Sequence, residues 1–336
     1  MAEFEYTAVI RTLGTAGAKY QQLLDSLQAQ TIAPKAIIVY IAEGYPLPKE
    51  TIGTERYVYV KKGMVAQRAL PYDEVETEWM LFLDDDLLLA PDTVKRMFTL
   101  LIENQADVIS PDIFPNAQRP FAAELMMTLS GRMRARRGDS KWGYKVMRTA
   151  GYSYNKDVKQ GVRWSETNAG ACFLCRKSDF LSIRFEKELW LDAVPYALGE
   201  DQVMYYKMFL HGLKILTWYD HQIQHLDGGG NLSPEKERML IYCDFRFKTI
   251  FWHRFIFTPE RNLLLKLWNS ICIVYALGFT LSISLLKGQW DIFKLKRKAI
   301  NDARDFLKSA TYHKLPKIIG IDGGKEDCSY CICFRK

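Results

Sequence analysis

The alternation of apolar, strand-like runs with amphipathic helical runs over the first hundred residues constrains the fold more than any other feature of the sequence. The runs "YTAVIRT" (6–12) and "KAIIVYIA" (35–42) are apolar without a period of two, which indicates strands that are buried on both faces. Between them, "AKYQQLLDSLQAQ" (18–30) places four apolar side chains on one side of a helix. The sequence therefore predicts a β–α–β unit in a Rossmann-like α/β fold, with a mostly parallel sheet flanked by helices.

The same alternation continues further along the chain. We expect a strand at 56–62, a turn at Gly63, a helix-like segment through residue 77, a strand at 79–86 and a helix at 90–104. A strand that runs into a helix follows at 168–180, and a helix with a further strand at 198–218. Residues 111–165 are less regular, and "SGRMRARRGDSKWG" (130–143) is either a solvated basic face or an anion-binding segment.

Composition narrows the class of protein. The 336 residues carry a formal net charge of +7, which favours acidic ligands or anionic lipid. The beginning of the chain is acidic and lacks the apolar core of a signal peptide, so we expect a cytosolic catalytic part. The seven cysteines do not form a disulfide framework. Cys172 and Cys175 are expected in the core, and "CSYCIC" (328–333) is either an incidental tail or a three-thiolate metal site.

Three aspartates, Asp84, Asp85 and Asp86, follow the apolar run "MLFL". In open parallel sheets, ligands bind at the carboxyl ends of the strands, which is where these residues are expected. Because residues two apart share a face of an extended segment, Asp84 and Asp86 would face one ligand while Asp85 points away. Carboxylates suit Mg²⁺ or Mn²⁺ bridging a diphosphate, and a solvated turn is the alternative.

A second acidic pair, Glu200 and Asp201, opens a predicted helix. Acids are favoured there by the helix dipole alone, so a solvated first turn explains them as well as a functional role does. His225 precedes the triple-glycine stretch 228–230, and it is either a metal or phosphate ligand or a structural hydrogen-bonding residue.

In their order, these segments resemble the family-2 glycosyltransferases of GT-A fold. The resemblance covers roughly residues 6–230 and rests on the following segments: "VIRTLGTAGAKYQQLLDSLQAQT", "KAIIVYIAEG", "GMVAQRAL", "MLFLDDDLLLAPDTV", "GACFLCRKSDF" and "GEDQVMYYKMFLHGLKI". It implies inverting transfer of a sugar from a nucleoside-diphosphate donor, assisted by a divalent metal, Mn²⁺ or Mg²⁺.

The resemblance also implies roles for individual residues. Thr12 and Glu43 would line the nucleoside pocket, and Arg68 would approach the diphosphate. Asp84 would hold the ribose or a metal-bound water, and Asp85 would also belong to the nucleotide-sugar site. Asp86 would be the direct metal ligand, with His225 adding to the metal shell. Asp201 would be the general base, while Glu200 orients the acceptor or shares that role.

A long uncharged run, "LWNSICIVYALGFTLSISLL" (267–286), is long enough to cross a bilayer. Basic residues flank both of its ends, so the positive-inside rule gives no orientation. It would span the membrane, lie in the cytosolic leaflet, or be a buried helix. A basic amphipathic helix is expected at 289–310, where it would either reinforce attachment to anionic lipid or remain a solvated surface helix.

The sequence thus predicts a GT-A domain at 1–235 with halves at about 1–110 and 111–235, a helical membrane-associating extension at 236–312 that contains the apolar segment 267–286, and a tail at 313–336. The expected partners are a nucleotide-sugar donor, a glycan or glycolipid acceptor and membrane lipid, without nucleic acid. The expected location is the cytoplasmic face of the inner membrane. The rival functions are a metal-dependent phosphoryl-transfer enzyme, for which no G-x-x-x-x-G-K-[ST] loop is present, and a catalytically silent sugar or nucleotide binder.

Overall fold

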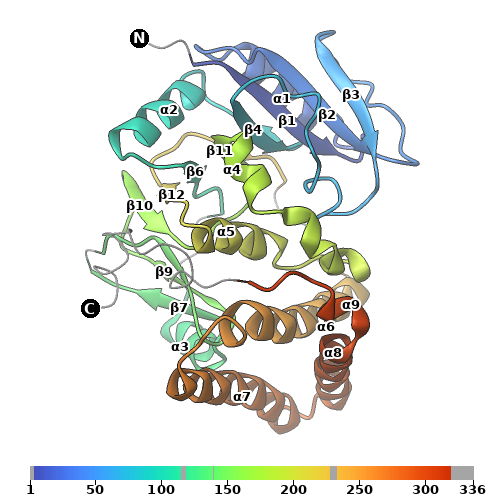
Figure 1. The fold of residues 1–336 in the computed structure, drawn as a ribbon, viewed down its shortest axis with the longest axis vertical. Coiled ribbons are helices and arrows are strands. Elements are labelled where there is room, and N and C mark those ends of the chain that lie inside the picture. Colours follow the sequence, from blue (N-terminus) through green and yellow to red (C-terminus); the bar gives the residue numbers. More distant parts are fainter. Residues whose placement is uncertain (1–3, 115–118, 139, 228–232, 319–336) are drawn as a thin grey trace.

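A computed structural model describes residues 4–114, 119–138, 140–227 and 233–318 (Figure 1). Its main sheet contains β1 (Tyr6–Thr12), β2 (Ala36–Ala42), β3 (Glu55–Val60), β4 (Trp79–Asp84), β6 (Val108–Pro111), β10 (Val162–Ser165), β11 (Cys172–Arg176) and β12 (Ile215–Trp218). Two small sheets are formed by β5 (Leu87–Leu88) with β13 (Gln224–His225), and by β7 (Met133–Arg136), β8 (Tyr144–Val146) and β9 (Tyr152–Asn155).

The helices are α1 (Ala18–Gln28), α2 (Thr93–Glu103), α3 (Phe121–Leu129), α4 (Lys177–Ser182), α5 (Glu200–Leu210), α6 (Pro234–Phe251), α7 (Leu263–Leu286), α8 (Trp290–Lys308) and α9 (Ala310–His313). A 3-10 helix, η1 (Phe185–Ala193), precedes α5, and a π-helix, η2 (Trp252–Phe257), continues α6. In Figure 1 the main sheet lies at the end of the molecule opposite α7, and α5 lies between the sheet and the lower helices.

The strand order of the main sheet is β10-β12-β6-β11-β4-β1-β2-β3. β1 pairs in parallel with both β2 and β4, and β2 pairs in parallel with β3, so the predicted β–α–β unit is confirmed. β11 runs antiparallel to β4 and β6, and β10 runs antiparallel to β12. The predicted mostly parallel α/β sheet is therefore confirmed, with two antiparallel strands in its second half.

Alternate residues of the strands feed two apolar cores on opposite faces of the sheet. Ala8 and Ile10 of β1 point into a core that α1 and α2 cover, whereas Val9 points into a core that α5 and α6 cover. Both cores include fully buried strand residues, and Cys172 and Cys175 are buried on opposite faces as free thiols, which confirms their predicted core position. Both faces of the sheet are thus covered by helices.

The helix expected between Gly63 and residue 77 is wrong, because this segment forms successive turns. Backbone N–H groups of Val65 and Ala66 donate to the Asp192 carboxylate at 3.1 and 2.8 Å, which starts one helical turn. Pro71 cannot continue a helix, and Tyr72 has a φ of 55°, in the left-handed region. The helical periodicity of the sequence is therefore interrupted by its own proline.

The region read as irregular contains α3 and the small sheet β7-β9-β8. Within its basic run, Arg132, Arg134 and Arg137 are exposed, whereas Arg136 is half-buried and donates to the backbone carbonyls of Trp142 and Gly143 at 3.1 and 2.9 Å. The expected apolar run and the basic amphipathic helix are α7 and α8. The triple-glycine stretch and the cysteine-rich tail lie outside the described residues.

A buried carboxylate ties the lower helices to the upper half of the protein. Glu188 of η1 is fully buried and accepts from Lys207 Nζ of α5 at 3.0 Å. Arg254 of η2 donates to it through Nε and Nη2 at 2.9 and 2.8 Å, and the Trp190 indole donates at 2.6 Å. Burial alone would raise the pKa of Glu188, but the two cations outweigh burial and hold this pKa below its ordinary value.

Candidate active site

The three aspartates lie where β4 ends, at the carboxyl edge of the sheet. β4 stops at Asp84, and Asp85 and Asp86 occupy the turn that leads into β5. β5 pairs antiparallel with β13, with Leu87 opposite His225, so a segment almost 140 residues further along the chain is fixed beside the turn. This pairing places His225 Nε2 3.1 Å from Asp86 Oδ2. The association of His225 with Asp86 thus follows from a two-residue strand pair.

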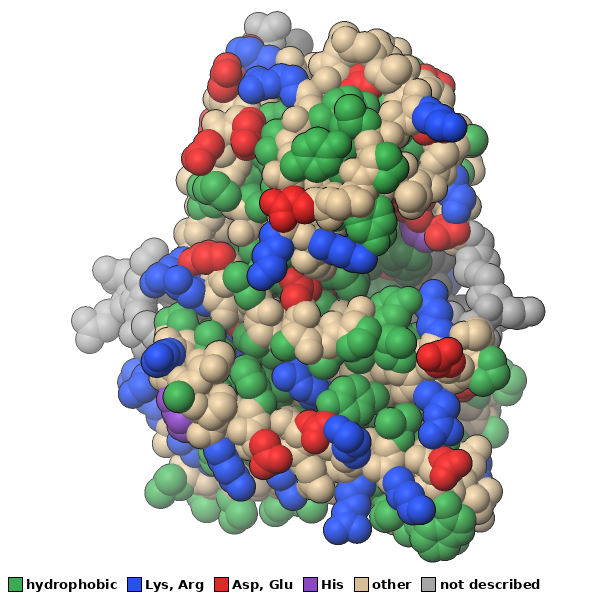
Figure 2. All heavy atoms as spheres, turned by 90° about the vertical axis from the view of Figure 1, so that its right-hand side faces the viewer, with side chains coloured by type: hydrophobic (Ala, Val, Ile, Leu, Met, Phe, Trp, Pro, Cys, Tyr) green, Lys and Arg blue, Asp and Glu red, His purple; other side chains and the backbone are tan. Residues whose placement is uncertain are grey.

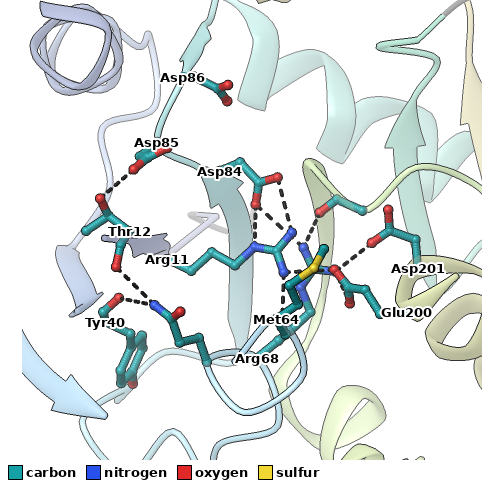
Figure 3. Close-up of polar contacts among 12 residues, drawn as sticks. Arg11, Thr12, Tyr40, Met64, Arg68, Asp84, Asp85, Asp86, Glu200 and Asp201 are labelled. Atoms are coloured by element: carbon teal, nitrogen blue, oxygen red, sulfur yellow. Dashed lines mark hydrogen bonds and ion pairs between the residues drawn. The ribbon is translucent and has the colours of Figure 1, made fainter. Parts of the chain in front are cut away.

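The three carboxylates have different partners, and Figure 3 shows those of Asp84 and Asp85. Asp84 accepts from Arg11 Nε and Nη2 at 2.6 and 3.2 Å, Asp85 accepts from the Thr12 hydroxyl, and Asp86 meets His225. The expectation that Asp84 and Asp86 share a face while Asp85 points away is wrong, because the strand ends at Asp84 and its alternation does not extend through the turn. Each aspartate therefore has a distinct environment.

The second acidic pair enters the site at the beginning of α5. Glu200 is 2% exposed and accepts from Arg11 Nη1 at 2.8 Å and from Arg68 Nη1 at 2.9 Å. Asp201 accepts from the same Arg68 Nη1 at 2.7 Å, but 35% of its side chain is exposed. Two arginines thus gather Asp84, Glu200 and Asp201 at one place, although α5 begins more than a hundred residues after β4 (Figure 3).

Arg68 is the central member of this network, and it is only 2% exposed. Besides the carboxylates, it donates through Nη2 to the carbonyl of Gly170 at 2.8 Å. Its guanidinium therefore faces the protein's own acceptors, which differs from the expected approach to a diphosphate. Arg11 also binds two of these carboxylates, Asp84 and Glu200. The sequence analysis did not single out Arg11, although a charged residue in a largely apolar strand, next to Thr12, was a signal for it.

Electrostatics separate the two acids of α5. Burial raises the pKa of Glu200 to about 7, against the opposing pull of Arg68 and Arg11. Burial would also raise the pKa of Asp201, but Arg68 and Arg11 outweigh it, and this pKa falls below its ordinary value. Asp201 is therefore ionised at neutral pH and partly exposed, whereas Glu200 is enclosed.

At the other end of the site, burial raises the pKa of Asp85 to about 6, and the neighbouring aspartates add to this effect. Burial also raises the pKa of Asp86, opposed by His225. Crowded carboxylates of this kind are stabilised by a cation, and a carboxylate with an imidazole is a suitable donor pair for Mn²⁺ or Mg²⁺ that keeps other positions for phosphate oxygens or water. Within the residues that the structure describes, no group of three or more His, Cys, Asp and Glu side chains gathers as a metal cage.

A pocket of about 280 Å³ opens in front of Asp201. Its wall combines Asp201, Gln202 and Asn168 with the aromatic rings of Tyr144, Tyr152 and Phe114. Asp112 also lines it and accepts from the Tyr144 hydroxyl at 2.7 Å. The Phe114 ring packs against His225 with ring centroids 4.7 Å apart, and His225 meets Asp86. The pocket of Asp201 therefore extends to Phe114, and one ring, that of His225, lies between Phe114 and Asp86.

Two hollows, of about 390 Å³ beside β10 and about 540 Å³ against α8, are larger and lie away from these carboxylates, so the site is assigned on its chemistry and not on its size.

Thr12 ends β1 and is 4% exposed, whereas Glu43 is exposed in the turn after β2, at the same edge of the sheet. Asp112 was missed because its region was read as irregular, although it directly follows β6.

Packing from the lower helices supports the start of α5. Gly199, the residue before Glu200, has a φ of 80°, and a Cβ built on it would lie 2.1 Å from the Phe247 ring of α6. Only glycine combines this backbone angle with so close an approach. The Phe247 ring of α6 thus packs against the turn that carries Glu200 and Asp201.

Comparison with known proteins bears on the central part of this site. Residues 57–161 match the family model described as glycosyl transferase family 2. The match is less than half of the chain and includes Asp84–Asp86 but not Glu200 and Asp201. No curated protein matches the chain. A solved structure described as GalNAc-T7 with UDP, GalNAc and Mn²⁺ is similar, with 14% identity and a TM-score of 0.47 over 80% of this chain and 55% of that chain. The chain thus spans a little more than half the length of that protein.

Proposed function

We propose that this family-2-like glycosyltransferase transfers a sugar from its nucleoside-diphosphate donor to an acceptor hydroxyl by direct displacement, with inversion at the anomeric carbon. The observation that carries the proposal is the continuity of the site: the pocket of Asp201 reaches Phe114, which packs on His225, the partner of Asp86. One end of the site presents an ionised, accessible carboxylate, and the other presents donors suited to a cation and a diphosphate.

Asp201 is the general base in this proposal. A sugar hydroxyl is a weak nucleophile, so a carboxylate within hydrogen-bond reach must take its proton while the new bond to the anomeric carbon forms. The bond from that carbon to the diphosphate oxygen breaks at the same time, and the electron pair leaves with the diphosphate. Because the low pKa of Asp201 keeps it ionised, it is ready to accept the proton at neutral pH.

Glu200 has a positioning role in this proposal. It is enclosed, and both of its oxygens are held by arginines, so it fixes Arg68 and Arg11 and through them the direction of Asp201. Asp84 acts in the same way by holding Arg11. These assignments replace a direct contact of Arg68 with the diphosphate and of Asp84 with the ribose.

The donor would occupy the carboxyl edge of β1, β2 and β4, with Thr12 and Glu43 on the nucleoside side and Asp85 holding the Thr12 hydroxyl. Asp86 and His225 would hold a divalent metal, Mn²⁺ or Mg²⁺. When bound, the metal would offset the negative charge that develops on the departing diphosphate.

The acceptor is proposed to be a lipid-linked or surface-polysaccharide precursor at the cytoplasmic face of the inner membrane. Three aromatic rings beside polar groups in the Asp201 pocket suit a sugar ring with its hydroxyls. The apolar helix α7, long enough to cross a bilayer, supports a membrane location.

A panel of nucleotide sugars, screened with Mn²⁺ for donor binding and slow hydrolysis, tests the proposal. We expect one donor to bind, Asp86→Ala to lose this binding, and Asp201→Asn to keep it while turnover is abolished. Asp92→Ala removes an exposed carboxylate at the start of α2 and serves as the control. Equal loss of binding in Asp86→Ala and Asp201→Asn would contradict the assigned roles, and binding without turnover in the wild type would favour a silent binder.

A further inference from the structure

Helices α3 and α7 together form an exposed apolar surface, here called the lipid face. In α7 the exposed side chains include Leu263, Leu264, Leu267, Val274 and Leu286, which are 79, 77, 60, 67 and 82% exposed. In α3, Phe121 is 75% exposed and Leu125 43%, and no residue of this largely apolar helix is buried. Figure 1 places α7 across the end of the molecule with α3 beside it, and Figure 2 shows hydrophobic side chains along that lower edge.

The opposite side of α7 is packed on the protein along the length of the helix. Asn269, Ile273, Ala276 and Ser284 are 1 to 4% exposed, and their spacing places them on one stripe. Near the beginning, Arg148 Nη1 donates to Asn269 Oδ1 at 2.5 Å, and the Trp252 indole donates to its carbonyl at 3.1 Å. A helix held along one side by the folded domain lies flat on the body of the protein.

The middle and the far end of α7 are in contact with the protein as well. Lys296 of α8 donates to Ser284 Oγ at 2.8 Å, and a Cβ at Gly131, two residues after α3, would lie 2.9 Å from the Ala276 Cβ. Withdrawing α7 to cross a bilayer would break these contacts and place the Asn269 side chain in hydrocarbon without its arginine. The packing therefore opposes a spanning orientation.

Charge complementarity identifies the occupant of the lipid face. Residues 261–298 contain seven lysines and arginines and a single acidic residue. Tyr275 and Trp268 are about half exposed on α7, and Trp290 is 61% exposed at the start of α8, which is the composition of a helix at a membrane interface. A second copy of this chain would bring the same basic residues together, whereas an anionic bilayer would offset them.

We propose that the lipid face docks in the plane of an anionic membrane, with α7 and α3 in the headgroup region and without any segment of α7 crossing the bilayer. This inference deepens the proposed membrane location and rests on it, but it does not rest on the proposed sugar transfer. Its consequence concerns the acceptor: Tyr152 of the Asp201 pocket lies on β9, whose neighbour β7 packs against α3. One small sheet therefore connects the wall of the pocket to α3 of the lipid face.

Flotation of the full chain with vesicles tests the docking. We expect binding to vesicles of phosphatidylcholine mixed with phosphatidylglycerol, weaker binding to phosphatidylcholine alone, and loss of binding between about 0.1 M and about 1 M salt, where the Debye length falls from about 10 to about 3 Å. Val274→Glu and Leu267→Glu should each weaken vesicle binding by roughly tenfold or more, because a carboxylate replaces an inserted apolar side chain. Ile102→Glu, on α2 and 58% exposed, is the matched control and should bind as the wild type does.

Extraction separates the in-plane orientation from the alternatives. Alkaline carbonate should release the wild-type chain from the vesicles, whereas resistance to carbonate would show a spanning helix and overturn the proposal. Equal vesicle binding by Val274→Glu and the wild type would overturn it too. So would a wild-type chain that does not bind vesicles but forms an oligomer, if Val274→Glu turns that oligomer into monomers. Donor hydrolysis by Val274→Glu should stay at the wild-type level, so a failure of docking and a failure of sugar transfer are read independently.

Discussion

Gly170 offers the most direct test of whether Asp201 takes part in the reaction. Its carbonyl accepts from Arg68, and a Cβ built on it would lie 2.1 Å from Asp201 Oδ1 and 2.6 Å from Arg68 Nη1. The φ of Gly170 is outside the left-handed region, so Gly170→Ala adds one methyl group without straining the backbone. The atoms nearest to the added methyl group therefore belong to Asp201 and Arg68.

The size of the effect follows from the crowding. Because ordinary contacts begin at 3.4 Å, the carboxylate must retreat by roughly 1 Å, and its 2.7 Å bond to Arg68 is lost. A displacement of about 1 Å of a catalytic group lowers turnover by roughly a hundredfold, which corresponds to about 2.7 kcal/mol in the activation free energy. The inserted methyl group also destabilises the fold by about 1–3 kcal/mol.

The assay is kcat for the donor identified in the screen, together with donor affinity and thermal unfolding. We expect kcat of Gly170→Ala to fall while donor affinity, which depends on the Asp86 end of the site, is retained. Gly278→Ala is the matched control, because a Cβ there meets nothing within 4 Å and the alanine stabilises α7 by about 0.5–1 kcal/mol. A Gly170→Ala enzyme that is folded and turns over at the wild-type rate would refute the role of Asp201.

Three further predictions concern the buried charges. Glu188→Ala should lower the free energy of unfolding by about 3–5 kcal/mol, because Lys207 and Arg254 are left buried without their carboxylate; a loss under about 1 kcal/mol in urea unfolding, typical of an exposed pair, would contradict this. The stability difference between the wild type and Glu188→Gln should be complete at neutral pH and shrink as the pH falls below about 4.3, since the folded pKa of Glu188 is depressed; a difference that grows in acid would have the wrong sign. Arg68→Lys should lower kcat at least roughly tenfold, because an ammonium cannot replace the fork that holds Asp201; unchanged kinetics would show that this geometry is dispensable.

Much of this fold is encoded in local patterns. The apolar strands and the helices of the first half are recognisable because burial on both faces removes the alternation of period two, and this burial is what the sheet shows. The helix expected before residue 77 failed because Pro71 and the left-handed Tyr72 interrupt a pattern that is otherwise helical. Periodicity of apolar residues indicates which side chains face a core, but it does not show whether the backbone can adopt helical dihedral angles at every position.

The residues of the candidate site were also predicted only in part. The acids at the end of β4 were found because charges interrupt an apolar run at a position where ligands bind, whereas those at the beginning of α5 were singled out by the presence of the upstream aspartates and of His225. Their partners could not be predicted, because Arg11 and Arg68 meet Glu200 across 189 and 132 residues of sequence. The direction of each aspartate also depended on where the strand ends, which a pattern places only to within a few residues. The domain boundary near residue 235 stays a prediction.

The close packing of Phe247 against Gly199 has a practical consequence for the design of truncated versions of this protein. The Phe247 ring belongs to α6, beyond residues 57–161 that match the family model, yet it packs against the turn from which Glu200 and Asp201 project. Deleting the chain after residue 235 to improve solubility would remove that support and uncover Tyr206 of α5, whose ring packs on Phe251 and Phe255. The helices after residue 235 thus support the turn that carries the proposed catalytic acid, and a detergent or vesicle that keeps them intact is preferable to a truncated version.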